Sequence, residues 1–234
     1  MSSTLAVAIP PSPFAFIERA ALPIDLAAEA RIARRRLTPV SILYSTYALG
    51  MLGVGLAGAH PLATLAWFAA GIAAWTFVEY LVHRYILHGV FADGPGFFQH
   101  LGHKLFGHLH VVHHRRPWDG AHINGTLKDT GVYVAILVGL SFLGPLHTWP
   151  MLMAGFLQSY IVEEWVHQSV HFYPFKGWYW EYIRRHHRYH HSPKGAEMAY
   201  GLSNGVWDVV CGTRIPEPVR SQLYKSMHRK AGRR

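Results

Sequence analysis

Two long apolar blocks dominate the pattern of hydrophobic and polar positions along the chain. The first, residues 37–78, contains no Asp, Glu, Lys or Arg. As one helix, these 42 residues would be about 63 Å long, twice the roughly 30 Å hydrocarbon core of a bilayer. Turn-forming residues at 57–62 divide the block. It therefore predicts a transmembrane hairpin with helices at about 37–57 and 62–83.

The second apolar block, residues 131–162, also lacks these four charged residue types, and a Gly- and Pro-containing stretch at 144–150 interrupts it. Its halves, at about 131–143 and 150–166, are each short for a full crossing. Flanking residues or local thinning of the bilayer must supply the remaining length. We expect two spans here, with a shallow re-entrant hairpin as the alternative. Together the blocks predict an all-α integral membrane fold with four transmembrane helices in two hairpins.

Residues 1–36 are expected to lie outside the bilayer core. Residues 14–36 have one apolar side and end in three arginines at 34–36, which is typical of an amphipathic helix in the membrane interface. An ordinary surface helix is the alternative. Residues 1–13 contain three prolines and no Lys or Arg, so we interpret them as a tail and not as a signal peptide. The arginines predict a cytoplasmic N-terminus, and each hairpin then returns to the cytoplasmic side.

The other segments are too polar to cross a membrane. Residues 89–130 are rich in Gly and His, and we expect a helix at 99–114 within them. The basic segment 220–234 is interpreted as a solvated C-terminal tail near anionic headgroups. Between the two terminal segments, residues 37–219 form the predicted membrane domain, with a cytosolic helical cap.

Composition supports a membrane protein and narrows the chemistry. Half of the residues are hydrophobic and 15% are charged, against about 25% in an average soluble domain. The net charge of +9 fits an anionic membrane surface better than nucleic acid, because the basic residues flank apolar runs. The single cysteine excludes a disulfide framework and a cysteine-based zinc site. With 18 histidines, imidazole is the only abundant ligand for a transition metal.

Ten histidines fall into four clusters with the patterns H-x4-H, H-x2-H-H, H-x3-H and H-x2-H-H. Residues i, i+3 and i+4 project from one face of a helix. Each triplet can therefore direct three imidazoles toward one point. A single histidine beside an apolar helix is usually an ordinary buried residue, but four clusters indicate a metal site. The ten are His83, His88, His110, His113, His114, His167, His171, His187, His190 and His191.

The first pair does not fit an ordinary helix. His83 and His88 lie about 140° apart at roughly 3.6 residues per turn. They converge only if the helix ends or widens near 85–87; otherwise each serves a different ion. Ten imidazoles are too many for one ion, so we expect two ions with a mainly histidine shell. A site at the membrane edge that faces an apolar interior suits a lipid substrate. Attack on an unactivated C–H bond of a lipid needs a metal that activates O2, so iron is preferred, with zinc as a possible substitute.

Four stretches of the chain carry a resemblance to a known family. They read HRYILH at 83–88, HVVHHRRPWD at 110–119, EWVHQSVH at 164–171 and HRYHH at 187–191. In this order, with apolar hairpins between them, they resemble the histidine boxes of the fatty acid hydroxylase superfamily. These integral-membrane di-iron proteins include fatty acid 2-hydroxylases and sterol desaturases. Residues 200–213 look like the segment that follows the last box in the 2-hydroxylase branch.

The resemblance implies a four-helix membrane base under a cytosolic cap, with the ten histidines binding two iron ions. The implied reaction is O2-dependent insertion of one oxygen into a lipid C–H bond, most simply in a fatty acyl chain. A sterol or carotenoid desaturase or hydroxylase is the alternative within the superfamily. A separate haem or iron–sulfur protein would donate electrons, because no fused haem-binding domain is seen. Residues 118–124 depart from the family's paired-proline stretch, which weakens the match to acyl 2-position hydroxylation.

Carboxylates near the histidine boxes are candidates for orienting the ligand rings. Glu164 matches an acidic position in the family and could accept a hydrogen bond from an imidazole N–H. Its neighbour Glu163 is the alternative. Asp208 lies beyond the last box, where a helix cap or turn is the ordinary role, and Glu79 lies one helical turn before the first box. A bare carboxylate near the membrane is unfavourable, so we expect at least one to pair with a histidine.

The remaining histidines match no family position, and we expect none of them to bind metal. They are His60, His100, His103, His108, His122, His147, His186 and His228. A His-rich metal transporter is the alternative from another class, but transporter sites usually lie near the bilayer midplane.

We therefore expect a membrane enzyme whose histidine clusters and both termini are cytoplasmic. The membrane would be the inner membrane in a bacterium and the endoplasmic reticulum in a eukaryote. The expected partners are a membrane lipid substrate and the electron donor, and not a nucleic acid. No pattern in the sequence indicates an oligomeric state.

Overall fold

The computed structural model describes residues 14, 17, 18, 20, 23–90 and 96–231, without the side chains of 90 and 226–231. Over these ranges every regular element is a helix, and η1 and η2 are π-helical. The elements are α1 (Leu26–Ala57), α2 (Pro61–Leu81), η1 (Val82–Val90), α3 (Phe97–Gly102), η2 (His103–Gly107), α4 (His108–Arg115), α5 (Leu127–Ser141), α6 (Trp149–Phe172), α7 (Trp178–His190), α8 (Val206–Val210) and α9 (Glu217–Ala231).

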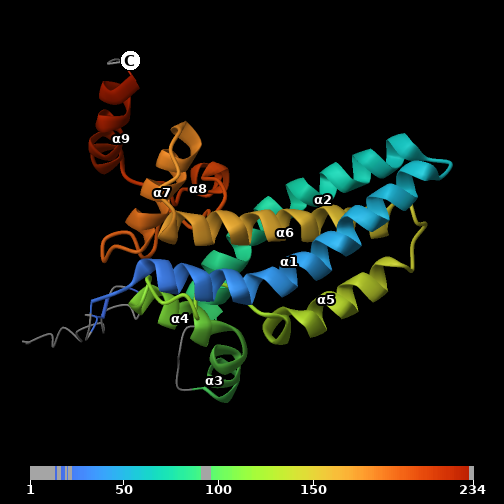
Figure 1. Cartoon of the computed structure of the whole chain (residues 1–234), viewed down its shortest axis with the longest axis horizontal. Coiled ribbons are helices and arrows are strands. Elements are labelled where there is room, and N and C mark those ends of the chain that lie inside the picture. The colour runs from blue at the N-terminus through green and yellow to red at the C-terminus, as the bar shows by residue number, and fades with distance from the viewer. Residues whose placement is uncertain (1–13, 15–16, 19, 21–22, 91–95, 232–234) are drawn as a thin grey trace, which may run out of the picture.

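Helices α1, α2, α5 and α6, called the long helices below, form an elongated bundle, and the other helices, called the short helices below, gather at one end of it (Figure 1). Helix α6 is central, since it packs against α1, α2 and α5. The chain leaves α2 through η1 and leaves α6 toward α7, so both hairpins lead into the short helices. This arrangement brings the four histidine clusters to the same end of the bundle.

Helix α1 differs from the prediction at its start. The Asp25 carboxylate accepts hydrogen bonds from the N–H groups of Ala27 and Ala28, both at 3.0 Å, and caps the helix there. The helix then runs unbroken past the three arginines at 34–36 to Ala57. A separate interfacial helix at 14–36 is therefore wrong. The Ala-, Leu-, Glu- and Arg-rich residues after Asp25 all favour a helix, and nothing stops it before the apolar block.

Glycines allow α2 and α6 to approach closely. A Cβ atom at Gly71 would collide with the backbone of Leu152, and one at Gly155 would collide with the backbone of Phe68. Small residues serve the same purpose at helix crossings in membranes. On the other side of α6, residues of α1 and α6 form a buried cluster. It contains Leu37, Val40, Tyr44, Leu157, Tyr160 and Ile161.

The outer surface of the bundle is apolar. The stretches Leu26–Ala57 and Pro61–Gly89 are long and apolar enough to cross a membrane. In the most apolar 18 residues of each stretch, the buried share is only 22% and 11%, respectively. The core helix of a soluble protein would be mostly buried, so these side chains face outward. In the second hairpin, α5 has 15 residues, about 23 Å of helix, and α6 has 24. The first hairpin thus has the expected length, whereas α5 is shorter than a bilayer core.

Two polar segments differ in detail from the prediction. The helix expected at 99–114 is present as α3, η2 and α4 in direct succession. The segment 220–234, expected as a solvated tail, belongs to α9 as far as residue 231. The predicted tail at 1–13, residues 232–234 and the side chain of His228 lie outside the described part of the chain.

Candidate metal centre

The π-helix η1 brings His83 and His88 together. A π-helix repeats its hydrogen bond at i to i+5, so residues five apart lie one turn above one another. The two imidazole centroids are 5.0 Å apart. This confirms the distortion predicted near 85–87. The alternative, in which each ring serves a different ion, is wrong because both belong to the same group of ligand atoms.

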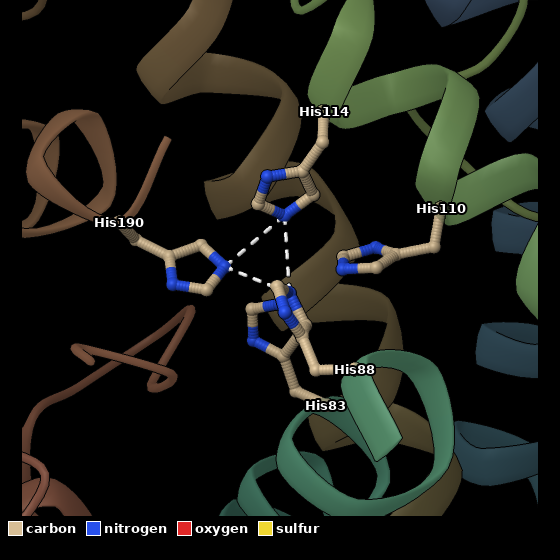
Figure 2. A group of neighbouring side chains, drawn as sticks. All are labelled: His83, His88, His110, His114 and His190. Atoms are coloured by element: carbon tan, nitrogen blue, oxygen red, sulfur yellow. Dashed lines mark hydrogen bonds between the residues drawn. The ribbon is translucent and has the colours of Figure 1, made fainter. Parts of the chain in front are cut away.

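Five histidines form a first group whose possible ligand atoms lie within 4.8 Å of one another (Figure 2). The Nε2 atoms of His88, His114 and His190 form a triangle with sides of 3.1, 3.1 and 3.2 Å. Figure 2 shows the rings converging from η1, α4 and α7. The members are His83, His88, His110, His114 and His190.

The other five sequence-predicted ligands form a second group with the same spread. The Nε2 atoms of His113 and His167 are 3.0 Å apart, and His187 Nε2 lies 2.8 Å from that of His171 and 3.0 Å from that of His191. These rings come from α4, α6 and the end of α7. The members are His113, His167, His171, His187 and His191.

The two H-x2-H-H triplets are divided between the groups, contrary to the expectation that each would aim at one point. On α4, His110 and His114 join the first group and His113 joins the second. On α7, His190 joins the first group while His187 and His191 join the second. The i and i+4 rings stay together, and the third ring of each triplet points to the neighbouring group. Helices α4 and α7 each supply ligands to both groups, so the two groups lie side by side.

The nitrogen spacing in each group fits a metal ion. A neutral imidazole has one N–H, so it cannot supply a donor to every neighbour in the His88–His114–His190 triangle. Zinc–nitrogen bonds are about 2.0–2.1 Å, so two nitrogens on one ion would be about 2.8–3.0 Å apart at a right angle and about 3.3–3.4 Å apart at the tetrahedral angle. The buried Nε2 atoms of His83 and His110 also have no hydrogen-bond partner among the described residues. The donor set therefore suits one ion in each group.

Burial keeps the grouped histidines of α4 and α7 neutral, which is the form that binds metal. Desolvation, reinforced by neighbouring imidazoles, lowers the pKa of His113, His114 and His187 well below its ordinary value. Burial likewise lowers the pKa of His190 to about 4. These rings are neutral at pH 7, so each retains a lone pair for a metal.

A loop after α7 fixes two rings of the first group. The Nδ1 atom of His83 lies against the carbonyl oxygen of Tyr200, and that of His190 is 2.7 Å from the carbonyl oxygen of Met198. A ring that donates its Nδ1 proton to a carbonyl leaves Nε2 free to bind metal. The histidine motifs do not predict this role, because a backbone carbonyl carries no residue-type signal.

Glu79 holds the same loop from α2. Its carboxylate accepts hydrogen bonds from the N–H groups of Leu202 and Ser203, at 2.6 and 2.9 Å, and from the Ser203 hydroxyl at 2.6 Å. Glu79 is 3% exposed, so these donors, and not water, satisfy its carboxylate oxygens. The carboxylate thus connects the helix that leads to His83 with the loop that orients His83.

Asp208 holds the other side of the loop and is fully buried. It accepts hydrogen bonds from the N–H groups of Tyr200 and Gly201 at 2.8 and 2.9 Å, and from the Thr213 hydroxyl at 2.7 Å. Its Oδ2 atom is 3.1 Å from Nε2 of His186, which confirms the expectation that one carboxylate pairs with a histidine. Burial tends to raise the pKa of Asp208, but the bond from His186 and these other donors hold it below its ordinary value.

The two glutamates of α6 lie close to the second group in sequence. Glu164 accepts a hydrogen bond from the Asn124 amide at 2.5 Å, where the sequence led us to expect an imidazole partner. Glu163 is buried, with 4% of its surface exposed. A role for either carboxylate in orienting a ligand ring stays a prediction.

The histidines expected not to bind metal lie outside both groups wherever their side chains are described. The rings of His60 and His147 pack against each other in the two turns remote from the short helices, with their centroids 4.3 Å apart and their planes tilted by 45°. His186 is buried next to His187 but faces Asp208. The others with described side chains are His100, His103, His108 and His122.

Comparison with known proteins gives this arrangement a family. A model of the fatty acid hydroxylase family matches residues 68–213. Fatty acid 2-hydroxylase of Rattus norvegicus is 33% identical over 152 residues, which are 64% of this chain and 40% of the rat protein. Dihydroceramide fatty acyl 2-hydroxylase of Arabidopsis thaliana is 27% identical over 146 residues, 62% of this chain and 59% of the plant protein. The chain thus spans less than two thirds of the length of either relative.

A solved structure described as full-length Scs7p, with only the hydroxylase domain visible, has the same fold. The TM-score is 0.63 at 23% identity, over 76% of this chain and 66% of that one. The family match covers more than half of the chain and includes all ten grouped histidines. The chain therefore belongs to the fatty acid hydroxylase family.

Proposed function

We propose that this chain is a membrane hydroxylase that inserts one oxygen atom of O2 into a C–H bond of a fatty acyl chain. The observation that carries the proposal is the pair of five-histidine groups at one end of an apolar helix bundle. Membership of the fatty acid hydroxylase family supports the reaction type.

The ten histidines would hold two iron ions, with zinc as a possible substitute. Iron bound there would supply the redox chemistry that activates O2 toward an unactivated C–H bond. Neutral rings, fixed from behind by the carbonyl oxygens of Met198 and Tyr200, would keep the ligand nitrogens in place. Inserting one oxygen of O2 and reducing the other to water takes two electrons, so the reaction needs a donor. A separate haem or iron–sulfur protein is the donor class that we propose.

The bundle would cross the membrane with all four long helices, and the short helices and both termini would lie on the cytoplasmic side. The arginines at 34–36, near the short-helix end of α1, support this orientation. Local thinning of the bilayer, or tilt of its neighbours, would accommodate the 15 residues of α5. The metal centre would then lie where an acyl chain can reach it from the bilayer.

An acyl chain is the preferred substrate. The rat relative is named a fatty acid 2-hydroxylase and the plant relative a dihydroceramide fatty acyl 2-hydroxylase, which supports an acyl group carried by a sphingolipid-like or simple lipid. A sterol or carotenoid substrate would be the alternative. A metal transporter is disfavoured, because the histidine groups lie at one end of the bundle and not at its middle.

The test is lipid mass spectrometry of cells expressing the chain, combined with metal analysis of the purified protein. We expect one lipid class to gain one oxygen atom, and about two metal ions per chain. His113→Ala should abolish the oxygen gain and reduce the metal content, because His113 lies in the second group. His60→Gln is the matched control, since His60 is exposed in the turn between α1 and α2, and it should change neither.

Each result also has an outcome that counts against the proposal. Purified protein without metal would overturn the metal centre. Metal content near two ions with loss of two hydrogens from the lipid, and no oxygen gain, would indicate a desaturase. Metal bound without any change in the lipids would favour the transporter.

A further inference from the structure

A buried aromatic residue from the N-terminal part of the chain lies against the first histidine group. Phe14 is 2% exposed, and its ring centroid is 4.0 Å from that of His88 and 5.1 Å from that of His114. The ring of His110 lies at 5.9 Å. All three histidines belong to the first group, so Phe14 forms part of the wall of that group.

The ring of Phe14 packs against α4 and against the segment that follows α7. It forms a buried cluster with Val111 of α4 and Ala196, which follows α7. Val111 is adjacent to the ligand His110 in sequence. Phe14 thus belongs both to this apolar cluster and to the wall of the first group, and an apolar wall limits the access of water to a metal site.

Polar contacts anchor the chain next to Phe14. The N–H of Glu18 donates to the carbonyl oxygen of Arg115 at 2.8 Å, at the end of α4. The Glu18 carboxylate pairs with the guanidinium of Arg116 at 2.6 Å, and both side chains are partly exposed. Glu18 therefore lies at the protein surface while Phe14 points inward. Phe14 separates the histidine rings from the solvent on this side.

We propose that Phe14 closes the first metal site to water and slows the exchange of its ion. His88, whose ring centroid lies nearest that of Phe14, is partly buried, whereas the other four members of the first group are buried, so the cover of His88 depends on the side chains packed against its ring. Removing the phenyl ring would open a path to His88 and His114. The inference rests on the proposed metal centre and adds a position outside the histidine boxes to it.

The experiment measures metal release from the full chain in detergent. The protein is loaded with Zn²⁺ and mixed with excess EDTA, and the zinc transferred is followed with time. In Phe14→Ala, we expect one of the two ions to leave about 10-fold or more faster than in the wild type, and the other to leave at the wild-type rate. Phe14→Leu should restore slow release, because leucine keeps an apolar cover.

Ile17→Ala is the matched control, because Ile17 lies three residues away but is 43% exposed. It should release both ions at the wild-type rate. Release from Phe14→Ala at the wild-type rate would overturn the inference while leaving the metal centre intact. Equal acceleration of both ions, with a lowered melting temperature by circular dichroism, would also overturn it, since it would indicate general loosening. Wild-type protein that binds no zinc would overturn both proposals.

Discussion

Asp208 lies two hydrogen bonds away from the ring of His83. Its carboxylate accepts from the N–H of Tyr200, and the carbonyl oxygen of Tyr200 faces Nδ1 of His83. Single residues can therefore control the metal centre without reaching it. A buried carboxylate fixes a loop, the loop fixes a ring, and the ring presents one defined nitrogen. Phe14 acts at the same scale by excluding water.

We expect Asp208→Asn to lower metal affinity by about 10- to 100-fold. The Asn side chain would replace one carboxylate oxygen by an NH2 group, which would face the N–H of either Tyr200 or Gly201, and a donor facing a donor in a buried site is unfavourable. Equilibrium competition with a chelator measures the affinity. Asp119→Asn is the control, because Asp119 bonds only near neighbours, Ala121 and His122, in a partly buried turn. Unchanged affinity in Asp208→Asn would contradict the assignment.

At the scale of elements, the sequence predicts what depends on local signals. The uncharged runs, and the turns that interrupt them, predicted most of the ends of the long helices to within a few residues. The five-residue step from His83 to His88 predicted that the helix ends or widens if the two rings converge, and η1 is a widened helix. The start of α1 was missed because the interfacial and apolar stretches join without a break.

The division of the triplets could not be predicted from one chain segment. Residues i, i+3 and i+4 share a helix face whichever ion each serves, so the choice depends on where the facing helices put their rings. The contacts of Phe14 and the carbonyl bonds from Met198 and Tyr200 were missed for a related reason. They join residues far apart in sequence through groups that carry no metal-binding pattern.

The five-residue spacing of the two histidines of η1 should be necessary for the first metal site. Inserting one alanine after Ile86 would put these histidines six residues apart. We expect the first group to lose its ion, because a six-residue step turns the ring of His88 about 120° away from that of His83 on an ordinary α-helix. Metal analysis should then give about one ion per chain instead of two. Inserting one alanine after Leu143, which is 85% exposed after α5, should leave both ions bound; two ions in the variant with the insertion after Ile86 would contradict the prediction.

At the scale of the whole molecule, apolar and polar surfaces are separated along the bundle. The long helices expose Leu, Ile and Val over most of their length, and the ionisable clusters lie with the short helices at one end. A protein in water would gain nothing from this separation, whereas a bilayer requires it. The two hairpin turns, where His60 contacts His147, mark the opposite end. The proposed orientation therefore predicts that the two ends lie on opposite sides of the membrane.

The single native cysteine allows a direct test of that orientation. Cys211 follows α8 among the short helices and is partly exposed. In bacterial cells expressing the chain, a membrane-impermeant maleimide should label Cys211 only after the inner membrane is opened. In a Cys211→Ser background, His60→Cys should be labelled once the outer membrane alone is permeabilised, because residue 60 is exposed in the turn between α1 and α2. Labelling of Cys211 with the inner membrane intact would reverse the orientation. Labelling of both positions from the same side would show that the first hairpin does not cross the bilayer.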